Sequence, residues 1–551
     1  MNGFAPRVIA VCVVCVVCAA ACGFGEPNSP RRVSEAMSAA ARPMYPVNEP
    51  PRQTAAVSES PPDALAPLTP PSTTTAPVRV DAPLSMDEVL DSVDARFPLL
   101  LAVEEELNIA EGGLLSAEGG FDLTARAELL DKPQGYYRYD TFNSVFEQPT
   151  PLWGTTFYSG YRWGQGDFPS YDDDLRTDRG GEVRAGVKVP ILQGGPIDAR
   201  RAKLQRARID VDLAEPKIQL KRIAFRRKAA QLYWKWVGAG QKLSIARSLL
   251  DLAETRNSAL RRRVDSGDLP RLELIDNERL IELRRAIVIA AERGFQESTI
   301  LLSLFLRDES GDPVLPDAAR LPPVFPEAAS PHLGSLQDAI DMALAWRPET
   351  RELSLLAERT RVDFREAENK LLPKVDMLLE ASKDFDRAPE TMDRTPAELA
   401  WKVQFEMPLW LRDARGKVRS TRAKLSKIAA ELRYARDQVA ADVRNAVSEL
   451  VTSHDRLVRT RESLRYAREV EAGERKSFEL GNSTILLVNL REEATATTAA
   501  LEADAATAFF QAEAAYRAAT AADLWDSSHA PLPPISAPDR PPNVAGASTP
   551  N

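Results

Sequence analysis

Two stretches of the sequence join a strand pattern to a long helix pattern. The first is Lys188-Val-Pro-Ile-Leu-Gln-Gly-Gly-Pro-Ile-Asp-Ala-Arg-Arg-Ala-Lys-Leu204. The second is Gln404-Phe-Glu-Met-Pro-Leu-Trp-Leu-Arg-Asp-Ala-Arg-Gly-Lys-Val-Arg-Ser-Thr-Arg-Ala-Lys-Leu425. In each stretch, the alternation of apolar and charged residues stops at a proline, Pro190 or Pro408. We therefore expect Pro190 and Pro408 to mark two strand-to-helix junctions.

A long helical pattern follows each junction. Residues 197–264 and 414–480 keep helical periodicity, and at ~1.5 Å per residue each pattern would span roughly 100 Å. Gly267 and Gly481 interrupt the two patterns, and another helical pattern returns after each glycine. The sequence thus predicts two long helical hairpins whose tips contain these glycines.

Alternation with a period of two predicts strands that have one apolar and one charged face. Four segments show it, at residues 120–130, 182–190, 374–382 and 399–408. Residues 131–180 are less regular and rich in aromatic residues, and they could form an extracellular loop. An additional hairpin is the alternative, because Phe157, Ser159, Tyr161 and Trp163 alternate with other residues.

The order of helix, strand, strand, long helix and returning helix occurs twice. The helical patterns that begin at Ser85 and Ser335 are offset by 250 residues, whereas the two junction prolines are offset by 218. This difference places about 32 extra residues between the strands of the first repeat. We predict a signal peptide at 1–22, a Pro/Ser/Thr-rich disordered tether at 23–83, a first repeat at 84–310, a Pro-rich connector at 311–333, a second repeat at 334–525 and a disordered tail at 526–551.

The cysteines are confined to the N-terminus, at Cys12, Cys15, Cys18 and Cys22. A basic residue, an apolar run and small residues precede Cys22, as in a secretory signal peptide. Cleavage before Cys22 would leave a thiol for lipidation, although Ala19 stands where lipoprotein signals usually have Leu. A signal peptide without lipidation and a retained anchor are the alternatives. No other stretch is long and apolar enough for a membrane-spanning helix.

Composition and motifs argue against two functional classes. The chain of 551 residues has a formal net charge of −9, which is unfavourable for a nucleic-acid-binding protein. His332, His454 and His529 are scattered without metal-ligand spacing, and we expect His454 to be exposed on a charged helix. Gly194-Gly195 is expected to be a turn rather than a phosphate-binding loop. We expect no catalytic, cofactor-binding or metal site, and no enzyme.

Strands with one apolar and one charged face suit the wall of a membrane β-barrel. Apolar side chains would face lipid, and charged side chains would face a water-filled lumen. Four strands are too few to close a barrel, and open edges are not tolerated in lipid, so several copies would have to close it together. A soluble β-sandwich is the alternative, but it leaves the attached long helices unexplained.

The chain resembles the outer-membrane efflux (TolC-like) family over about residues 84–525. The resemblance rests on the order and duplication of the elements, on Leu372-Pro373 before a strand, on both junctions and on both glycine breaks. It implies an α+β membrane protein of two tandem repeats. It further implies a homotrimer with a 12-stranded β-barrel in the outer membrane and an α-helical coiled-coil tunnel through the periplasm. A periplasmic adaptor protein and an inner-membrane pump are the implied partners.

The hairpin tips are the expected contacts with the adaptor, although the glycines could be helix stops alone. The expected contact residues are Ser266, Gly267, Asp268, Gly481, Asn482 and Ser483. Family channels close with acidic rings six and nine residues after the second tip glycine, but this chain has Leu487 and Leu490 there. The same offsets in the first repeat hold Glu273 and Asp276, which lie on one helix face. We expect carboxylate rings from this pair or an apolar constriction from the leucines, and an exposed acidic face is the alternative.

The sequence predicts an outer-membrane exit duct of a tripartite efflux pump for small molecules. The duct would lie in the outer membrane of a Gram-negative-type cell, in contact with its lipid, and would extend into the periplasm. Type I protein secretion is an alternative that the sequence does not separate from efflux. A lipid-anchored periplasmic coiled-coil scaffold without a pore is a further alternative, and the two-faced strands argue against it.

Overall fold

The computed structural model describes residues 82–169, 176–331, 334–386 and 397–525. These residues belong to one compact unit, Pro77–Asn551. The predicted signal peptide with Cys22, almost all of the predicted tether and the tail lie outside the described residues. His332 and His529 lie outside them too.

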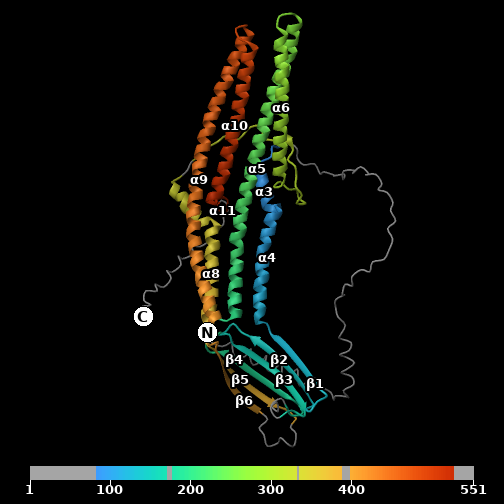
Figure 1. Cartoon of the computed structure of the whole chain (residues 1–551), viewed down its shortest axis with the longest axis vertical. Coiled ribbons are helices and arrows are strands. Elements are labelled where there is room, and N and C mark those ends of the chain that lie inside the picture. The colour runs from blue at the N-terminus through green and yellow to red at the C-terminus, as the bar shows by residue number, and fades with distance from the viewer. Residues whose placement is uncertain (1–81, 170–175, 332–333, 387–396, 526–551) are drawn as a thin grey trace, which may run out of the picture. The chain divides into compact units, whose positions relative to one another are not determined.

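Helices make up most of the described unit (Figure 1). They are α3 (Met86–Arg96), α4 (Pro98–Glu118), α5 (Ala199–Asp265), α6 (Arg271–Ser303), α7 (Leu336–Trp346), α8 (Pro348–Asn369), α9 (Arg412–Glu479), α10 (Ile485–Thr520) and α11 (Ala522–Trp525). Short 3₁₀ helices lie at η1 (Gly119–Phe121) and η3 (Ala318–Arg320). The two long helical patterns after the junctions therefore form the single helices α5 and α9, and α5 continues through Pro216.

Two helical patterns that the sequence presents as continuous are each broken at a proline. α3 ends before Phe97, and α4 begins at Pro98. In the second half, Arg347 separates α7 from α8, which begins at Pro348. Phe97 and Arg347 are extended, with ψ of 116° and 130°, because a following proline disfavours the helical conformation. Proline then starts the next helix at little cost, since its missing N–H would have no partner there.

A single antiparallel sheet contains six strands in sequence order. The strands are β1 (Thr124–Lys132), β2 (Tyr139–Pro149), β3 (Thr156–Gly166), β4 (Glu182–Pro190), β5 (Lys374–Asp384) and β6 (Ala397–Glu406). β2 and β3 form the additional hairpin that the sequence analysis gave as the alternative to a loop. Each chain therefore has six strands instead of the four counted from the clearest sequence patterns, and three such chains do not give the 12 strands that the resemblance implies.

The helices pack in a row on the side that leads to the sheet. α4 packs against α5, α5 against α8, and α8 against α9. Towards the tips, α6 packs against α5 and α10 packs against both α5 and α9. No helix among residues 82–169, 176–331, 334–386 and 397–525 is both long and apolar enough to cross a membrane.

The main hydrophobic core lies where both halves of the chain meet. It joins residues from six helices, including Val93, Leu100, Trp236, Leu302, Leu457 and Phe509. The connector also contributes, because a Cβ at Gly240 would lie 2.3 Å from the Leu321 side chain. The backbone of Leu84 donates to the carbonyl of Arg320 at 2.8 Å. The Pro-rich connector is therefore packed against α5 in the described structure.

Candidate functional site

The six-stranded sheet has one polar and one apolar face. Residues that pair directly across strands lie on the same face, so the register assigns each side chain to a face. One row across the polar face is Arg126, Val145, Gly160, Arg184, Ser382 and Glu398. The adjacent row on the other face, which holds no charged residue, is Ala125, Phe146, Ser159, Ala185, Ala381 and Leu399.

Hydrogen bonds on the polar face tie the additional hairpin to the strands beside it. The Tyr158 hydroxyl donates to Oε2 of Glu380 at 2.7 Å, although β4 lies between their strands. Gly186 lies beneath the Tyr158 ring, and a Cβ at Gly186 would be 2.5 Å from that ring. Arg184 donates to Oδ1 of Asn143 at 2.8 Å. These contacts order β2 and β3 against β4 and β5.

Ion pairs on the same face are partly shielded from solvent. Arg162 and Glu182 lie 2.7 Å apart, and Glu182 is buried. Lys188 and Asp376 lie 2.9 Å apart, and Asp376 is buried. The face therefore carries neutralised charges that water can solvate, as the inner wall of a pore requires.

The apolar face exposes large side chains on every strand. In β6, Trp401 and Phe405 are 72% and 67% exposed, which is unusual for a large apolar residue in a soluble protein. Other exposed residues of this face are Leu129, Phe146, Phe157, Val183, Met377, Leu379 and Leu399. Exposed apolar side chains on neighbouring strands mark a contact with lipid or with another protein.

The first predicted junction is a compact turn. β4 ends at Pro190, as expected, and Gly194 follows in the left-handed region with φ of +90°. The Gly194 N–H donates to Oδ1 of Asn369 at 2.7 Å, which ties the turn to the end of α8. Asp198 caps α5 by accepting from the Arg201 N–H at 2.8 Å. This cap satisfies one free N–H at the helix start.

The second junction is built differently from the first. β6 ends at Glu406, two residues before Pro408, and α9 begins at Arg412. Leu411 precedes α9 in the left-handed region, with φ of +49°, and offers no side-chain cap. Asp413, which matches Asp198 in sequence, lies inside the helix and pairs with Lys417 at 2.6 Å. The two junctions share their position but not their cap.

Both hairpin tips have the same backbone geometry. Gly267 and Gly481 have φ of +80° and +78°. The Asp268 N–H donates to the Arg263 carbonyl at 2.8 Å, and the Asn482 N–H donates to the Ser477 carbonyl at 2.9 Å. This is the Schellman arrangement that ends a helix at a left-handed glycine. Ser266 precedes Gly267 directly, and Ser483 follows Gly481 by two residues in the other turn. Contact of these residues with an adaptor stays a prediction.

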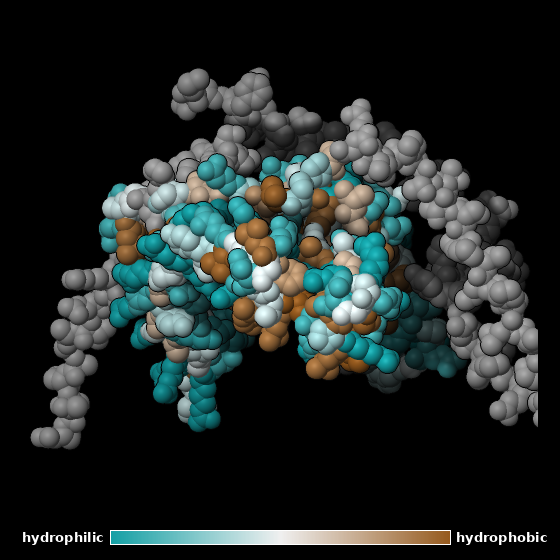
Figure 2. All heavy atoms as spheres, turned by 90° about the horizontal axis from the view of Figure 1, so that it is seen from above, coloured by the Kyte–Doolittle hydropathy of each residue, from teal (hydrophilic) through white to brown (hydrophobic). Residues whose placement is uncertain are grey.

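The predicted gate positions lie in two helices just past the tips. Asp276 in α6 pairs with Arg279 of the same helix at 3.0 Å, and Glu273 lies one turn earlier. Leu487 and Leu490 in α10 are exposed. Exposed leucines occur near both tips, and Figure 2 shows hydrophobic patches among hydrophilic residues at this end. The roles of these four residues as a gate stay predictions.

The sequence reasoning missed a buried carboxylate in α10. The Glu492 side chain is 0% exposed and accepts a hydrogen bond from Arg475 of α9 at 3.1 Å. It also accepts from Arg256 of α5, and it lies 3.6 Å from Arg284 of α6. Burial lowers the pKa of Arg284, and the charge of Glu492 opposes that effect. One carboxylate thus joins both helical hairpins.

No protein-family model matches the sequence, and none of the curated proteins matches it. Solved structures do match the fold. CusC, described as forming a transmembrane channel, has 12% identity and a TM-score of 0.57 over 83% of this chain and 98% of that one. The outer membrane protein VceC of Vibrio cholerae has 14% identity and a TM-score of 0.56 over 79% of this chain and 95% of that one. The MtrE outer membrane channel of Neisseria gonorrhoeae has 13% identity and a TM-score of 0.57 over 79% of this chain and 88% of that one.

The chain has the fold of these outer-membrane channels. The similarity spans about four fifths of the chain and nearly all of each channel protein. It confirms the α+β fold that the sequence resemblance implies.

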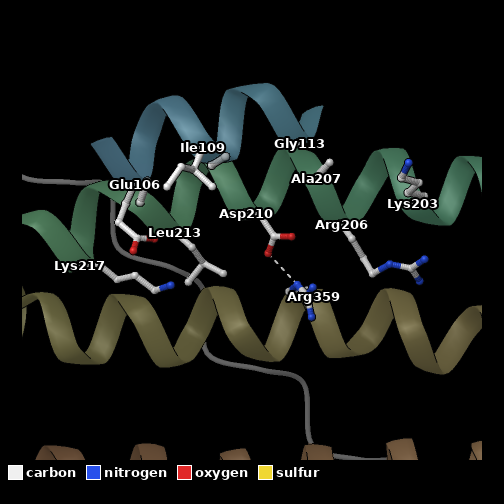
Figure 3. Close-up of a pocket in the computed structure, with 12 residues that line it drawn as sticks. Glu106, Ile109, Gly113, Lys203, Arg206, Ala207, Asp210, Leu213, Lys217 and Arg359 are labelled. Atoms are coloured by element: carbon white, nitrogen blue, oxygen red, sulfur yellow. Dashed lines mark hydrogen bonds and ion pairs between the residues drawn. The ribbon is translucent and has the colours of Figure 1, made fainter. Parts of the chain in front are cut away.

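Within this outer-membrane channel fold, a groove of about 370 Å³ lies along α4, α5 and α8. Figure 3 shows Asp210 of α5 directed at Arg359 of α8, at 2.6 Å. Arg206, also in the groove, pairs with Asp363 and Glu366. Burial alone would raise the pKa of Glu366, but its hydrogen bonds from Lys370 and Arg206 lower it. The groove is thus an ion-paired seam rather than a site with converging free groups.

The described part of this channel fold holds no group of three or more side chains suited to a metal ion. His454 is not exposed as expected: its side chain is 16% exposed and lies 5.6 Å from the Phe509 ring, between centroids. α10 packs against α9, and its Phe509 ring covers part of the His454 side chain. Burial against an aromatic ring fits a structural residue.

Proposed function

We propose that this chain is the outer-membrane exit duct of a tripartite efflux pump that exports small molecules. The observation that carries the proposal is the two-faced sheet that continues into α5 and α9. Its apolar face is exposed, and its polar face carries paired charges. The similarity to outer membrane channels supports the same reading.

A homotrimer would complete the duct. One sheet has two open edges, which cost several kcal/mol per unpaired backbone group in lipid. Copies of the chain around a common axis remove these edges by pairing them. The helices that leave the sheet would then line one tunnel on the periplasmic side.

The partners follow from this placement. The tips at Gly267 and Gly481 lie at the far ends of α5 and α9, where a periplasmic adaptor could reach them. The adaptor would connect the duct to an inner-membrane pump that supplies the energy. The duct itself would be passive and not an enzyme. Lipidation at Cys22 would add an anchor in the outer membrane.

Flux through liposomes tests the channel. The purified full chain, reconstituted into liposomes loaded with a small dye, should release the dye and give discrete conductance steps in planar bilayers. The same protein unfolded before reconstitution is the control. Folded protein in the vesicles that gives neither release nor steps would contradict the channel and favour the scaffold. Export of an unfolded protein, but of no small molecule, in cells that supply adaptor and pump would favour the secretion duct.

A further inference from the structure

We propose that three copies close as an 18-stranded barrel through a seam between β1 of one copy and β6 of the next. The hairpin of β2 and β3 is part of the barrel wall. This inference rests on the proposed channel and adds its strand count and the register of the seam. It replaces the 12 strands that the family resemblance implies.

The hairpin places large apolar side chains on the apolar face of the sheet and charged side chains on the polar face, although Asp140 lies on the apolar face at the strand end far from the helices. Phe146 of β2 and Phe157 of β3 lie on the apolar face, 41% and 48% exposed. Tyr158 and Arg162 lie on the polar face, where they contact β5 and β4. A hairpin folded into the lumen would not continue both faces in register. β2 and β3 are therefore wall strands, as their place in the middle of the sheet shows (Figure 1).

The turn of the hairpin is fitted to the first junction. Gly154 has φ of +70°, and a Cβ there would lie 2.6 Å from the carbonyl oxygen of Gly194. A Cβ at Gly195 would lie 2.7 Å from Nε1 of Trp153. The helix-side end of the hairpin is thus fixed against the start of the turn into α5. This contact holds the helix-side end of the hairpin in line with the neighbouring strands.

The two outer strands are left with one partner each. β1 pairs only with β2, and β6 pairs only with β5, within the described sheet. Every residue of both strands is exposed. Each outer edge presents unpaired backbone groups, which lipid cannot satisfy. A second copy of this chain supplies the missing edge.

The stagger of the strands sets the register of the seam. Following the pairing from Thr124 leads across the sheet through Glu147, Tyr158, Gly186 and Glu380 to Ala400. β6 continues six residues further towards the helices, to Glu406. The helix-side ends of both strands therefore meet if Thr124 pairs with Glu406 of the next copy. Six residues of stagger over six strands correspond to a tilt of about 35°, within the usual range for barrels.

Charges on the two edges complement each other in this register. Antiparallel pairing of Thr124 with Glu406 places Glu128 opposite Lys402 and Lys132 opposite Glu398. All four side chains belong to the polar face. Opposite charges in directly paired positions stabilise a strand pair. The nine residues of β1 match the last nine of β6.

Cysteine cross-linking tests the seam in the full chain. Ala127 and Val403 face each other in the proposed register, on the apolar face. The double variant Ala127→Cys/Val403→Cys should oxidise to covalent trimers on a non-reducing gel, and each single variant should not. The control pair Ala127→Cys/Leu399→Cys is out of register by four residues, about 13 Å along the strand. The native cysteines all lie within residues 1–22.

Electron cryo-microscopy of the full-chain assembly in nanodiscs counts the strands independently of any variant. We expect 18 strands and a barrel about 1.5 times as wide as one of 12 strands, since diameter grows with strand number. Twelve wall strands in an assembly that still conducts would overturn this inference and leave the proposed channel standing. Cross-links from the control pair alone would overturn the register. An assembly with neither ring nor conductance would overturn both proposals.

Discussion

At Glu492, one buried carboxylate faces three guanidinium groups from three other helices. Arg256, Arg284 and Arg475 come from α5, α6 and α9. Removing one member of a buried ion network leaves the others desolvated without compensation. Glu492 therefore holds the two helical hairpins in a fixed relation close to their tips.

Replacing this carboxylate should loosen the hairpins. Glu492→Gln keeps the shape of the side chain but removes its charge, and the expected loss of stability is about 3–5 kcal/mol. Hydrogen exchange of amides in α5, α6 and α10 near the tips measures the loss as faster exchange. Glu493→Gln, at the exposed neighbouring position, is the matched control. Equal protection in both variants would contradict a structural role for the network.

The contact between Trp153 and Gly195 allows a paired test. Gly195→Ala should destabilise the sheet by about 1–3 kcal/mol, because the new methyl group overlaps the indole ring. Trp153→Ala combined with Gly195→Ala should recover stability relative to Gly195→Ala alone. Thermal unfolding followed by circular dichroism measures both variants. A double variant less stable than the single one would show that the two residues are not in this contact.

The burial and contacts of single residues were harder to predict from the sequence than the helices and strands. Glu492 follows Ile485 and Val488 on a buried stripe of α10, so its helical spacing was the available signal. The many other Glu and Arg residues of the long helices concealed it, because most of them lie on solvated faces. His454 was misplaced for the related reason that its own helix does not reveal which face α10 covers.

At the scale of elements, periodicity predicted the long helices closely and the hairpin poorly. α5 and α9 begin and end within two residues of the predicted bounds, because charged helical repeats of that length have no competing interpretation. β3 was ambiguous because its polar face contains Gly160, Gly164 and Gly166. Aromatic residues occupy both of its faces, which blurs the apolar and polar alternation. Only the pairing with β2 and β4 resolves the two faces.

The two faces of β5 predict opposite effects for neighbouring leucines. Leu379 lies mid-strand on the apolar face, and Leu378 lies beside it on the polar face. Leu379→Arg should cost about 2–4 kcal/mol of membrane stability if lipid covers that face at mid-depth. Leu378→Arg is the matched control and should cost much less. Folded protein recovered in bilayers, separated by gel mobility without heating, measures the difference. Equal yields would contradict a lipid-facing surface.

The tips should depend on glycine for its backbone conformation alone. A Cβ at Gly267 or Gly481 would meet open space, yet both residues have positive φ. Gly267→Ala or Gly481→Ala should therefore cost about 1–2 kcal/mol. Local hydrogen exchange at the turns measures this cost. Gly294→Ala, inside α6, is the control and should be neutral or stabilising. An equal loss of stability in Gly294→Ala would contradict the explanation that positive φ causes the cost at the tips.

At the scale of the whole molecule, the proposed gate depends on how three copies of the chain would meet near the hairpin tips. Three Asp276 carboxylates around one axis would favour cations. Asp276→Asn should then lower cation selectivity, measured as a reversal potential across a salt gradient in planar bilayers. Glu282→Gln, an exposed acid further along α6, is the control. Leu487→Ala should raise conductance if the leucines form the constriction. No change from either variant would exclude both gate arrangements.

The hairpin of β2 and β3 has a consequence for the bore of the proposed duct. Four helices per chain, α4, α5, α8 and α9, adjoin in a row, and at spacings of 8–10 Å they occupy about 32–40 Å of circumference. Six tilted strands occupy about 35 Å, whereas four would occupy only about 23 Å. The sheet therefore matches the width of the helical row that it meets. In the proposed duct, the bore would then keep a nearly constant width from the tunnel into the barrel, so a molecule that passes the tunnel would also pass the exit.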